Sequence, residues 1–206
     1  MAAVLLAGGL GRRMRQDGAV ADKPLRALAG QSLLAHTIAR IRPQVGAMAI
    51  NANGDPARFA DFGVDVIADD VPDYPGPLAG ILAGMRWAAA RGCADVLSVP
   101  TDTPFLPSDL VVRLQAARAQ AGVPLACAGS GGWRHPVVGL WTVALADALE
   151  ADLRAGMRKI GQWTAQYGVA VAEFEIGRVD PFLNINTPDE LTMAERAWAR
   201  LADDQG

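Results

Sequence analysis

Cysteine is scarce in this chain of 206 residues. The two cysteines, Cys93 and Cys127, lie far apart in the sequence and form no CxxC pair. Such a pattern is typical of buried, reduced thiols. It does not indicate a zinc site or a framework of disulfides.

A large excess of charge and long apolar runs are also missing. The formal net charge is only -3, so no broad basic surface for nucleic acid is expected. No run approaches the roughly 18 apolar residues that span a bilayer. The start, MAAVLLAGGLGRRM, has its positive charges after a short apolar run, the reverse of a signal peptide. We therefore expect a cytoplasmic protein with no nucleic-acid or membrane partner.

The chain shows no repeats, linkers or low-complexity segments, and short apolar runs alternate with longer amphipathic stretches. The runs predict strands at 4–7, 47–51, 64–68, 96–99, 125–128 and 169–174. The stretches predict helices at 33–42, 78–91, 108–121, 142–155 and 159–167. This alternation predicts an α/β fold with a mostly parallel sheet and helices on both faces.

The last helix carries its own start signal. Thr187, Pro188 and Glu190 form a capping box with proline at the first helical position. The helix is predicted to run to about Leu201. We expect residues 1–201 to form a single domain and 202–206 to be a frayed tail.

Polar and glycine-rich segments follow the predicted strands, where ligands of open parallel sheets bind. The first holds Gly8, Gly9 and Gly11, which allow backbone N–H groups to approach a phosphate closely. It matches neither a Walker A loop nor the Rossmann fingerprint, and as a lone glycine loop it could be a plain turn. Several cations in or after the loop favour a triphosphate ligand. They are Arg12, Arg13, Arg15 and Lys23.

Asp102 follows a strongly apolar run and lies between two prolines, Pro100 and Pro104. A carboxylate at this position can hold Mg²⁺ that bridges to substrate phosphates. An N-cap or turn role before the next helix is the alternative.

Other polar residues are candidates for reading the base and the acceptor. Asn51 and Asn53 offer amide donors and acceptors, and Asp69 suits the paired N–H groups of guanine, although a plain turn would also explain Asn53. The stretch Gly129–Gly132 with Trp133 to Pro136 is interpreted as a flexible polar connection, in which His135 could contact an acceptor phosphate. Asn184 and Asn186 place alternate side chains on one face of an extended segment.

Taken together, these motifs resemble the molybdenum cofactor guanylyltransferases, from Val4 to about Arg196. The resemblance rests on LAGG with RRM, Lys23, NAN at 51–53, DYPGPLAG at 73–80, DTP at 102–104, HP at 135–136 and NINTPDEL at 184–191. The chain departs from the family pattern at Arg15, where glycine is usual, and in a longer run at 16–22.

The resemblance implies a Rossmann-like, three-layer nucleotidyltransferase fold and transfer of GMP from GTP to the terminal phosphate of molybdopterin. It also implies Mg²⁺ as cofactor and molybdoenzyme maturation proteins as partners. The implied nucleotide-binding residues are Leu6, Ala7, Gly8, Gly9, Lys23, Asn51, Asp69 and Asp102, the last also binding the metal. Arg13, Lys23 and Asp102 would be catalytic, and His135, Asn184 and Asn186 would bind the acceptor.

Three alternatives remain at this point. A cytidylyltransferase acting on the same acceptor, or a sugar-nucleotidyltransferase, would use another nucleotide, although Gly8-Gly9 favours guanine. A non-catalytic nucleotide-binding module on the same fold would release no pyrophosphate. The basic loop together with Asp102 argues against that module.

Overall fold

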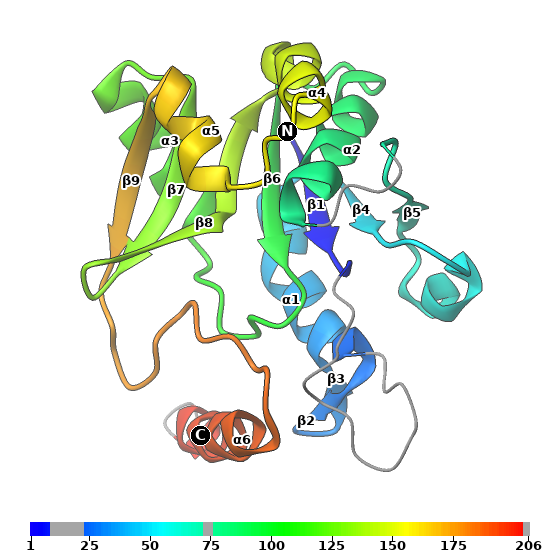
Figure 1. Cartoon of the computed structure of the whole chain (residues 1–206). Coiled ribbons are helices and arrows are strands. Elements are labelled where there is room, and N and C mark those ends of the chain that lie inside the picture. Colours follow the sequence, from blue (N-terminus) through cyan, green and yellow to red (C-terminus); the bar gives the residue numbers. More distant parts are fainter. Residues whose placement is uncertain (9–22, 72–75, 204–206) are drawn as a thin grey trace.

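A computed structural model describes residues 1–8, 23–71 and 76–203 of the chain. A mixed sheet of seven strands forms its centre, in the order β5-β4-β1-β6-β8-β7-β9 (Figure 1). The strands are β1 (Ala2–Leu6), β4 (Ala47–Asn51), β5 (Asp65–Ile67), β6 (Asp95–Pro100), β7 (Leu125–Ser130), β8 (Trp133–Thr142) and β9 (Val169–Phe174). Only β8 runs antiparallel to its sheet neighbours, β6 and β7. The expectation of a mostly parallel sheet is confirmed.

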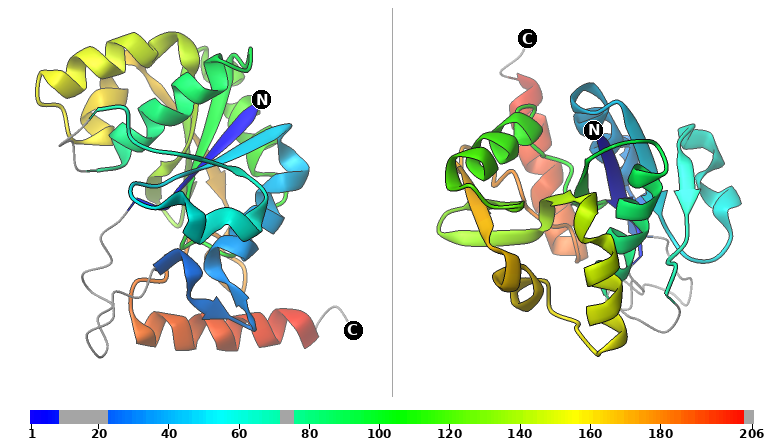
Figure 2. Two further views of the ribbon diagram at one scale, coloured as in Figure 1. Left: turned by 90° about the vertical axis from the view of Figure 1, so that its right-hand side faces the viewer. Right: turned by 90° about the horizontal axis from the view of Figure 1, so that it is seen from above.

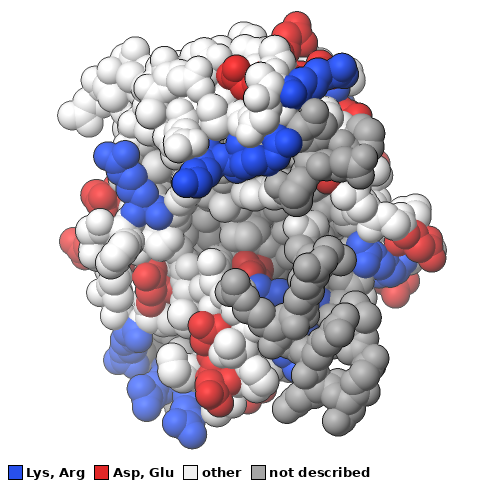
Figure 3. Space-filling model, in the orientation of Figure 1, with Lys and Arg blue, Asp and Glu red and all other residues white. Residues whose placement is uncertain are grey.

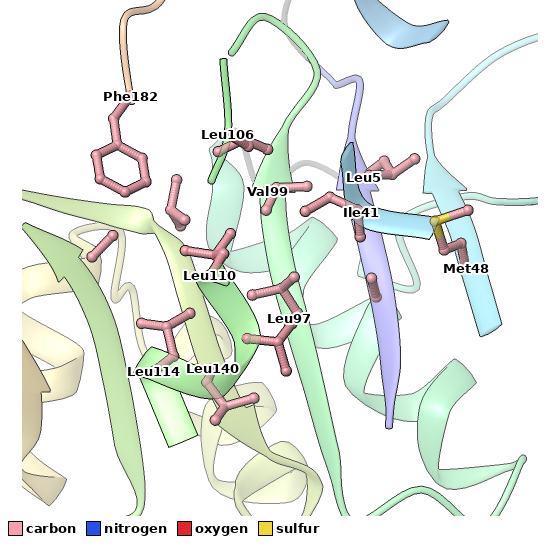
Figure 4. Packing of buried hydrophobic residues seen from close by; sticks show 14 of the residues in the cluster. Leu5, Ile41, Met48, Leu97, Val99, Leu106, Leu110, Leu114, Leu140 and Phe182 are labelled. Carbon is pink, nitrogen blue, oxygen red and sulfur yellow. The ribbon is translucent and has the colours of Figure 1, made fainter. Parts of the chain in front are cut away.

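Side chains of successive strand residues enter opposite faces of the sheet, as the pleat requires. Leu5, Leu97 and Leu140 pack with α1 (Leu33–Ile41) and α3 (Leu110–Ala121) in one cluster (Figure 4). Val4 and Trp141 face the other side and join a second cluster. That cluster includes α2 (Pro77–Ala89), α4 (Ala146–Arg154) and α5 (Ile160–Tyr167). The result is three layers, helix on sheet on helix.

A smaller unit lies beyond the sheet edge at which β1 and β6 end (Figures 1 and 2). It consists of the hairpin β2 (Ala27–Leu28) with β3 (Gln31–Ser32) and the last helix, α6 (Pro188–Asp203). Leu28 and Ile185 are fully buried in its apolar cluster. The predicted capping box is present, because the Glu190 N–H donates to Thr187 Oγ1 at 3.2 Å and Glu190 Oε2 accepts from the Thr187 N–H at 2.8 Å. This helix therefore begins where the sequence indicates.

Two sequence predictions are wrong. The segment interpreted as a flexible connection, 129–136, contains the end of β7 and the start of β8, which pair across the turn Gly131-Gly132, where both glycines have positive φ. Pro136 lies where the register shifts, so its missing N–H breaks no regular ladder. The helix predicted from 142 begins later, since Thr142 ends β8 and a 3-10 turn, Val143–Leu145, precedes α4.

Four shorter features had no sequence prediction. They are the hairpin of β2 and β3 and the 3-10 helices Lys23–Leu25, Arg42–Gln44 and Pro56–Phe62. None of the helices in the described ranges is long and apolar enough to cross a membrane.

Candidate active site

Three residues far apart in the sequence meet at the edge where the parallel strands end. Lys23 opens the first 3-10 helix, Asp102 follows β6, and Asn186 directly precedes the capping residue of α6. The Lys23 ammonium donates to Asp102 Oδ2, and to Asn186 Oδ1 at 2.5 Å. Both charged side chains are largely enclosed, with 16% and 15% of their surface exposed. A charge pair so enclosed is screened less by water and salt than a pair on the surface.

The local sequence around Asp102 holds it in place. Thr103 Oγ1 donates to the Pro100 carbonyl at 3.0 Å, which closes the turn after β6. Thr101 Oγ1 donates to the Leu6 carbonyl at 3.3 Å, which ties this turn to the end of β1. The Ile185 N–H donates to the Asp102 carbonyl at 3.0 Å and brings the segment before α6 to the same point.

One carboxylate oxygen of Asp102 is free to bind a ligand. Its Oδ1 is buried and has no hydrogen-bond partner among the described residues, whereas Oδ2 accepts from Lys23. A buried, unpaired carboxylate oxygen is costly unless a ligand completes its contacts. Over the described ranges, no group of three or more His, Cys, Asp or Glu could hold a metal ion. The donor set fits Mg²⁺, which commonly binds to one carboxylate, substrate phosphates and water.

Asn51, Asn53 and Asp69 form a second polar group on the neighbouring strands of the same edge. Asp69 accepts from Asn51 Nδ2 at 3.0 Å and from Asn53 Nδ2 at 2.8 Å, one bond to each carboxylate oxygen. The Asp69 N–H returns a bond to Asn53 Oδ1 at 3.0 Å. Asn53, interpreted from sequence as a possible plain turn, therefore holds Asp69 by two hydrogen bonds, one to its carboxylate and one from its backbone N–H.

The carboxyl end of β1 and the helix α2 pack closely together. The Ala7 N–H donates to the Asn51 carbonyl at 2.9 Å, and Gly8 lies next to the Asn51 side chain. A Cβ at Gly80, on the first turns of α2, would lie 2.2 Å from Asn51 Oδ1 and 2.9 Å from Leu6 Cδ2. Gly80 is required here because any side chain would displace Asn51.

We expect Gly80→Ala to lower the free energy of unfolding by about 1–3 kcal/mol, the usual effect of overpacking. Displacement of Asn51 should also weaken nucleotide binding. Gly161→Ala, in α5, is the matched control, because a Cβ there meets nothing within 4 Å. Urea unfolding of the two variants measures the difference. Equal stability of Gly80→Ala and the wild type would contradict the close packing.

Two of the three predicted acceptor residues, Asn184 and Asn186, lie on the segment that joins β9 to α6. Asn186 reaches Lys23, as described above, and Asn184 is exposed two residues earlier. His135, on β8, is partly buried and its ring lies 4.6 Å from that of Phe182 on the same segment. The surface is hollowed between the sheet and α6 on this side of the molecule (Figure 3).

Several predicted residues fall outside the described ranges. They are Gly9 and Arg13, expected from the resemblance to bind the nucleotide and to act in catalysis, the neighbouring Arg12 and Arg15, and the residues 73–75 of the proline-glycine loop. Sequence reasoning also missed two polar residues, Ser130 and Asp180, which bond to each other beside His135. Ser130 ends a strand, as Asn51 does, and that position was the one available signal.

Known proteins are similar to this chain over almost its whole length. A family model described as the MobA-like NTP transferase domain matches residues 3–171. The molybdenum cofactor guanylyltransferase of Rhodopseudomonas palustris (strain BisB5) is 52% identical over 201 residues, which cover 96% of this chain and 94% of the relative. The chain belongs to the molybdenum cofactor guanylyltransferase family. It is thus a nucleotidyltransferase, as its motifs indicated.

Solved structures confirm the nucleotidyltransferase fold. Molybdopterin-guanine dinucleotide biosynthesis protein A from Archaeoglobus fulgidus superposes with a TM-score of 0.71 at 23% identity, over 97% of this chain and 100% of that one. A structure of Rv0371C from Mycobacterium tuberculosis H37Rv, in complex with manganese, gives a TM-score of 0.64 at 15% identity, with 95% and 97% covered. At such identities the likeness shows the fold.

Proposed function

We propose that this guanylyltransferase-family chain transfers the GMP part of GTP to the terminal phosphate of molybdopterin, releasing pyrophosphate. The supporting observation is the convergence of Lys23, Asp102 and Asn186 at the strand edge that also holds Asn51 and Asp69. Membership of the family supplies the substrates. Mg²⁺ is proposed as the metal, with Asp102 as its protein ligand.

The residues around the phosphates are proposed to have different chemical roles. Lys23 would supply a positive charge beside the phosphates of GTP. The backbone of Leu6, Ala7, Gly8 and Gly9 would lie along those phosphates. Arg13, from the same loop, would add a second cation. Bound Mg²⁺ would neutralise the charge that develops on the leaving pyrophosphate.

The transfer itself needs no side-chain nucleophile. An oxygen of the acceptor phosphate attacks the α-phosphorus in line, a new P–O bond forms, and the bond to the β-phosphate oxygen breaks. The electron pair leaves with pyrophosphate. Positioning and electrostatic stabilisation provide most of the rate in such reactions.

Guanine selection is assigned to Asp69 and Asn51. A carboxylate accepts from the paired N–H groups of guanine, whereas cytosine and uracil present no such pair. Asn51 and Asn53 each hold one Asp69 oxygen and leave its remaining lone pairs for the base. His135, Asn184 and Asn186 are proposed to bind the acceptor.

Thermal-shift titration with GTP, CTP, ATP and UTP tests the nucleotide. We expect GTP to raise the melting temperature most. Asp69→Ala should weaken GTP binding by about 10- to 100-fold, the loss expected for a hydrogen bond to a charged group. Asp70→Ala is the control, since its ion pair with Arg86 is exposed and contributes little.

A response to CTP alone would contradict the guanine assignment and favour a cytidylyltransferase acting on the same acceptor. Equal GTP binding by Asp69→Ala and Asp70→Ala would remove Asp69 from the base site.

A further inference from the structure

A hydrogen-bonded chain links Asp180, Ser130 and His135 beside the site. Ser130 Oγ lies 2.8 Å from His135 Nε2 and 3.0 Å from Asp180 Oδ1. Asp180 Oδ1 also accepts from the Phe182 N–H at 2.9 Å. Ser130 ends β7 and is 1% exposed, and Asp180 belongs to the segment that continues to Asn186.

The positions of the protons follow from the donor and acceptor inventory. An ionised carboxylate can only accept, so the single proton of the Ser130 hydroxyl points to Asp180. The same hydroxyl oxygen can then only accept from His135, which therefore carries its proton on Nε2. The other ring nitrogen, Nδ1, makes no hydrogen bond with the described residues and is not among their buried, unpaired atoms.

The surroundings of His135 favour the neutral ring. Burial is the largest influence and lowers the pKa of His135 below its usual 6.5, while the nearby charges of Asp180 and Glu173 act in the opposite direction. Arg134 is its neighbour in the chain, and its side chain emerges on the other side of the strand. Phe182 lies against the ring at a centroid distance of 4.6 Å and limits its rotation. Nδ1 is therefore left as a fixed hydrogen-bond acceptor.

The position of His135 Nδ1 relates it to the transfer site. Phe182 and Asn186 lie on one short segment, four residues apart, and at most about 3.6 Å of chain separates successive residues. The nitrogen is therefore within reach of an acceptor molecule whose phosphate lies at Lys23. A phosphate monoester is largely dianionic at pH 7, because its second pKa is about 6, so it offers no proton to Nδ1.

We propose that Ser130 and Asp180 are positioning residues that hold His135 with its proton on Nε2, so that Nδ1 accepts from an N–H group on the pterin ring of the acceptor. This inference rests on the proposed function. The sequence suggested that His135 contacts the phosphate of the acceptor. The inference assigns His135 to the pterin ring instead. The contact fixes which end of the acceptor faces the nucleotide.

Nitrogen-15 NMR of the histidine rings tests the tautomer directly, without any substrate. The chain has only two histidines, and His135→Gln assigns the signals by leaving His36 alone. At pH 7 we expect a neutral His135 with its proton on Nε2. Ser130→Ala and Asp180→Ala should each produce a mixture of His135 tautomers. Asp180→Asn keeps an oxygen that can accept from Ser130, so it should preserve the tautomer with the proton on Nε2.

Kinetics of the full chain with GTP and molybdopterin test the role of the nitrogen. Ser130→Ala should raise the KM for the acceptor by about two- to tenfold, the loss of one neutral hydrogen bond, with the KM for GTP unchanged. A protonated ring at pH 7, a proton on Nδ1, or an unaltered tautomer in Ser130→Ala would overturn the positioning. The expected tautomers with an unchanged acceptor KM would overturn the pterin contact. Absence of any product from the wild type would instead refute the proposed function, which the NMR result does not depend on.

Discussion

Asp102→Asn is expected to reduce turnover by about a thousandfold or more. Asparagine keeps the size of the side chain and an oxygen for Lys23, but it loses the negative charge that would hold Mg²⁺. Loss of a single electrostatic contact to a transition state often costs about 10²–10³ in rate, and a metal ligand contributes more than one such contact. Pyrophosphate release at saturating GTP, molybdopterin and Mg²⁺ measures the effect.

The control for this variant is Asp109→Asn. Asp109 lies only seven residues later, at the start of α3, and its ion pair with Arg113 at 3.8 Å is exposed. Asp109→Asn should keep wild-type turnover. Both variants should give the wild-type circular dichroism spectrum, because the turn around Asp102 is also held by Thr101 and Thr103. Near wild-type turnover of Asp102→Asn with Mg²⁺ would show that the metal assignment is wrong.

Lys23→Gln is expected to lower kcat/KM by about 10²- to 10³-fold. The ammonium bonds to both Asp102 and Asn186, so its loss removes the charge beside the phosphates and frees the two side chains that it holds. Lys23→Arg keeps the charge, but a planar guanidinium does not fit a position built for a compact ammonium. We therefore expect Lys23→Arg to recover only part of the activity.

A double-mutant cycle distinguishes a shared site from two separate ones. If Lys23 and Asp102 act on one nucleotide, the double variant should lose little more than the more impaired single variant, because groups that act as a unit are not additive. Additive losses would place the two residues in independent roles.

The sequence predicted that several candidate residues would lie together, because the carboxyl ends of parallel strands share an edge of the sheet. Leu6 pairs in register with both Asn51 and Pro100, so the residues just after β1, β4 and β6 had to lie side by side. Apolar runs and the sheet rule were sufficient for this inference. They also give the two faces of the sheet, whereas α6 was predicted from its capping box.

Strand β8 was not predicted from the sequence, although its second half, Val137 to Thr142, is an apolar and β-branched run that is typical of a strand. The first half has a weaker signal, because Arg134 and His135 are polar and Pro136 has no N–H, and it becomes a strand through pairing with β7 across Gly131-Gly132. Contacts of that kind depend on where the partner strand already lies. The intrinsic preference of the segment is overridden by its tertiary surroundings.

The sequence also could not predict the contact between Ser130 and Asp180. Fifty positions separate them, and neither carries a motif. By contrast, the Lys23–Asp102 pair was expected to converge, because the resemblance implied that both residues contact one triphosphate. Family motifs therefore indicated distant partners that periodicity alone does not pair.

The most direct test combines purified chain, GTP, molybdopterin and Mg²⁺, and measures the dinucleotide and pyrophosphate formed. The account predicts equal amounts of the two products from the wild type, and almost none from Lys23→Gln or Asp102→Asn. Wild-type chain that binds GTP yet releases no pyrophosphate, or variants that match its rate, would contradict a triphosphate held jointly by Lys23 and Asp102.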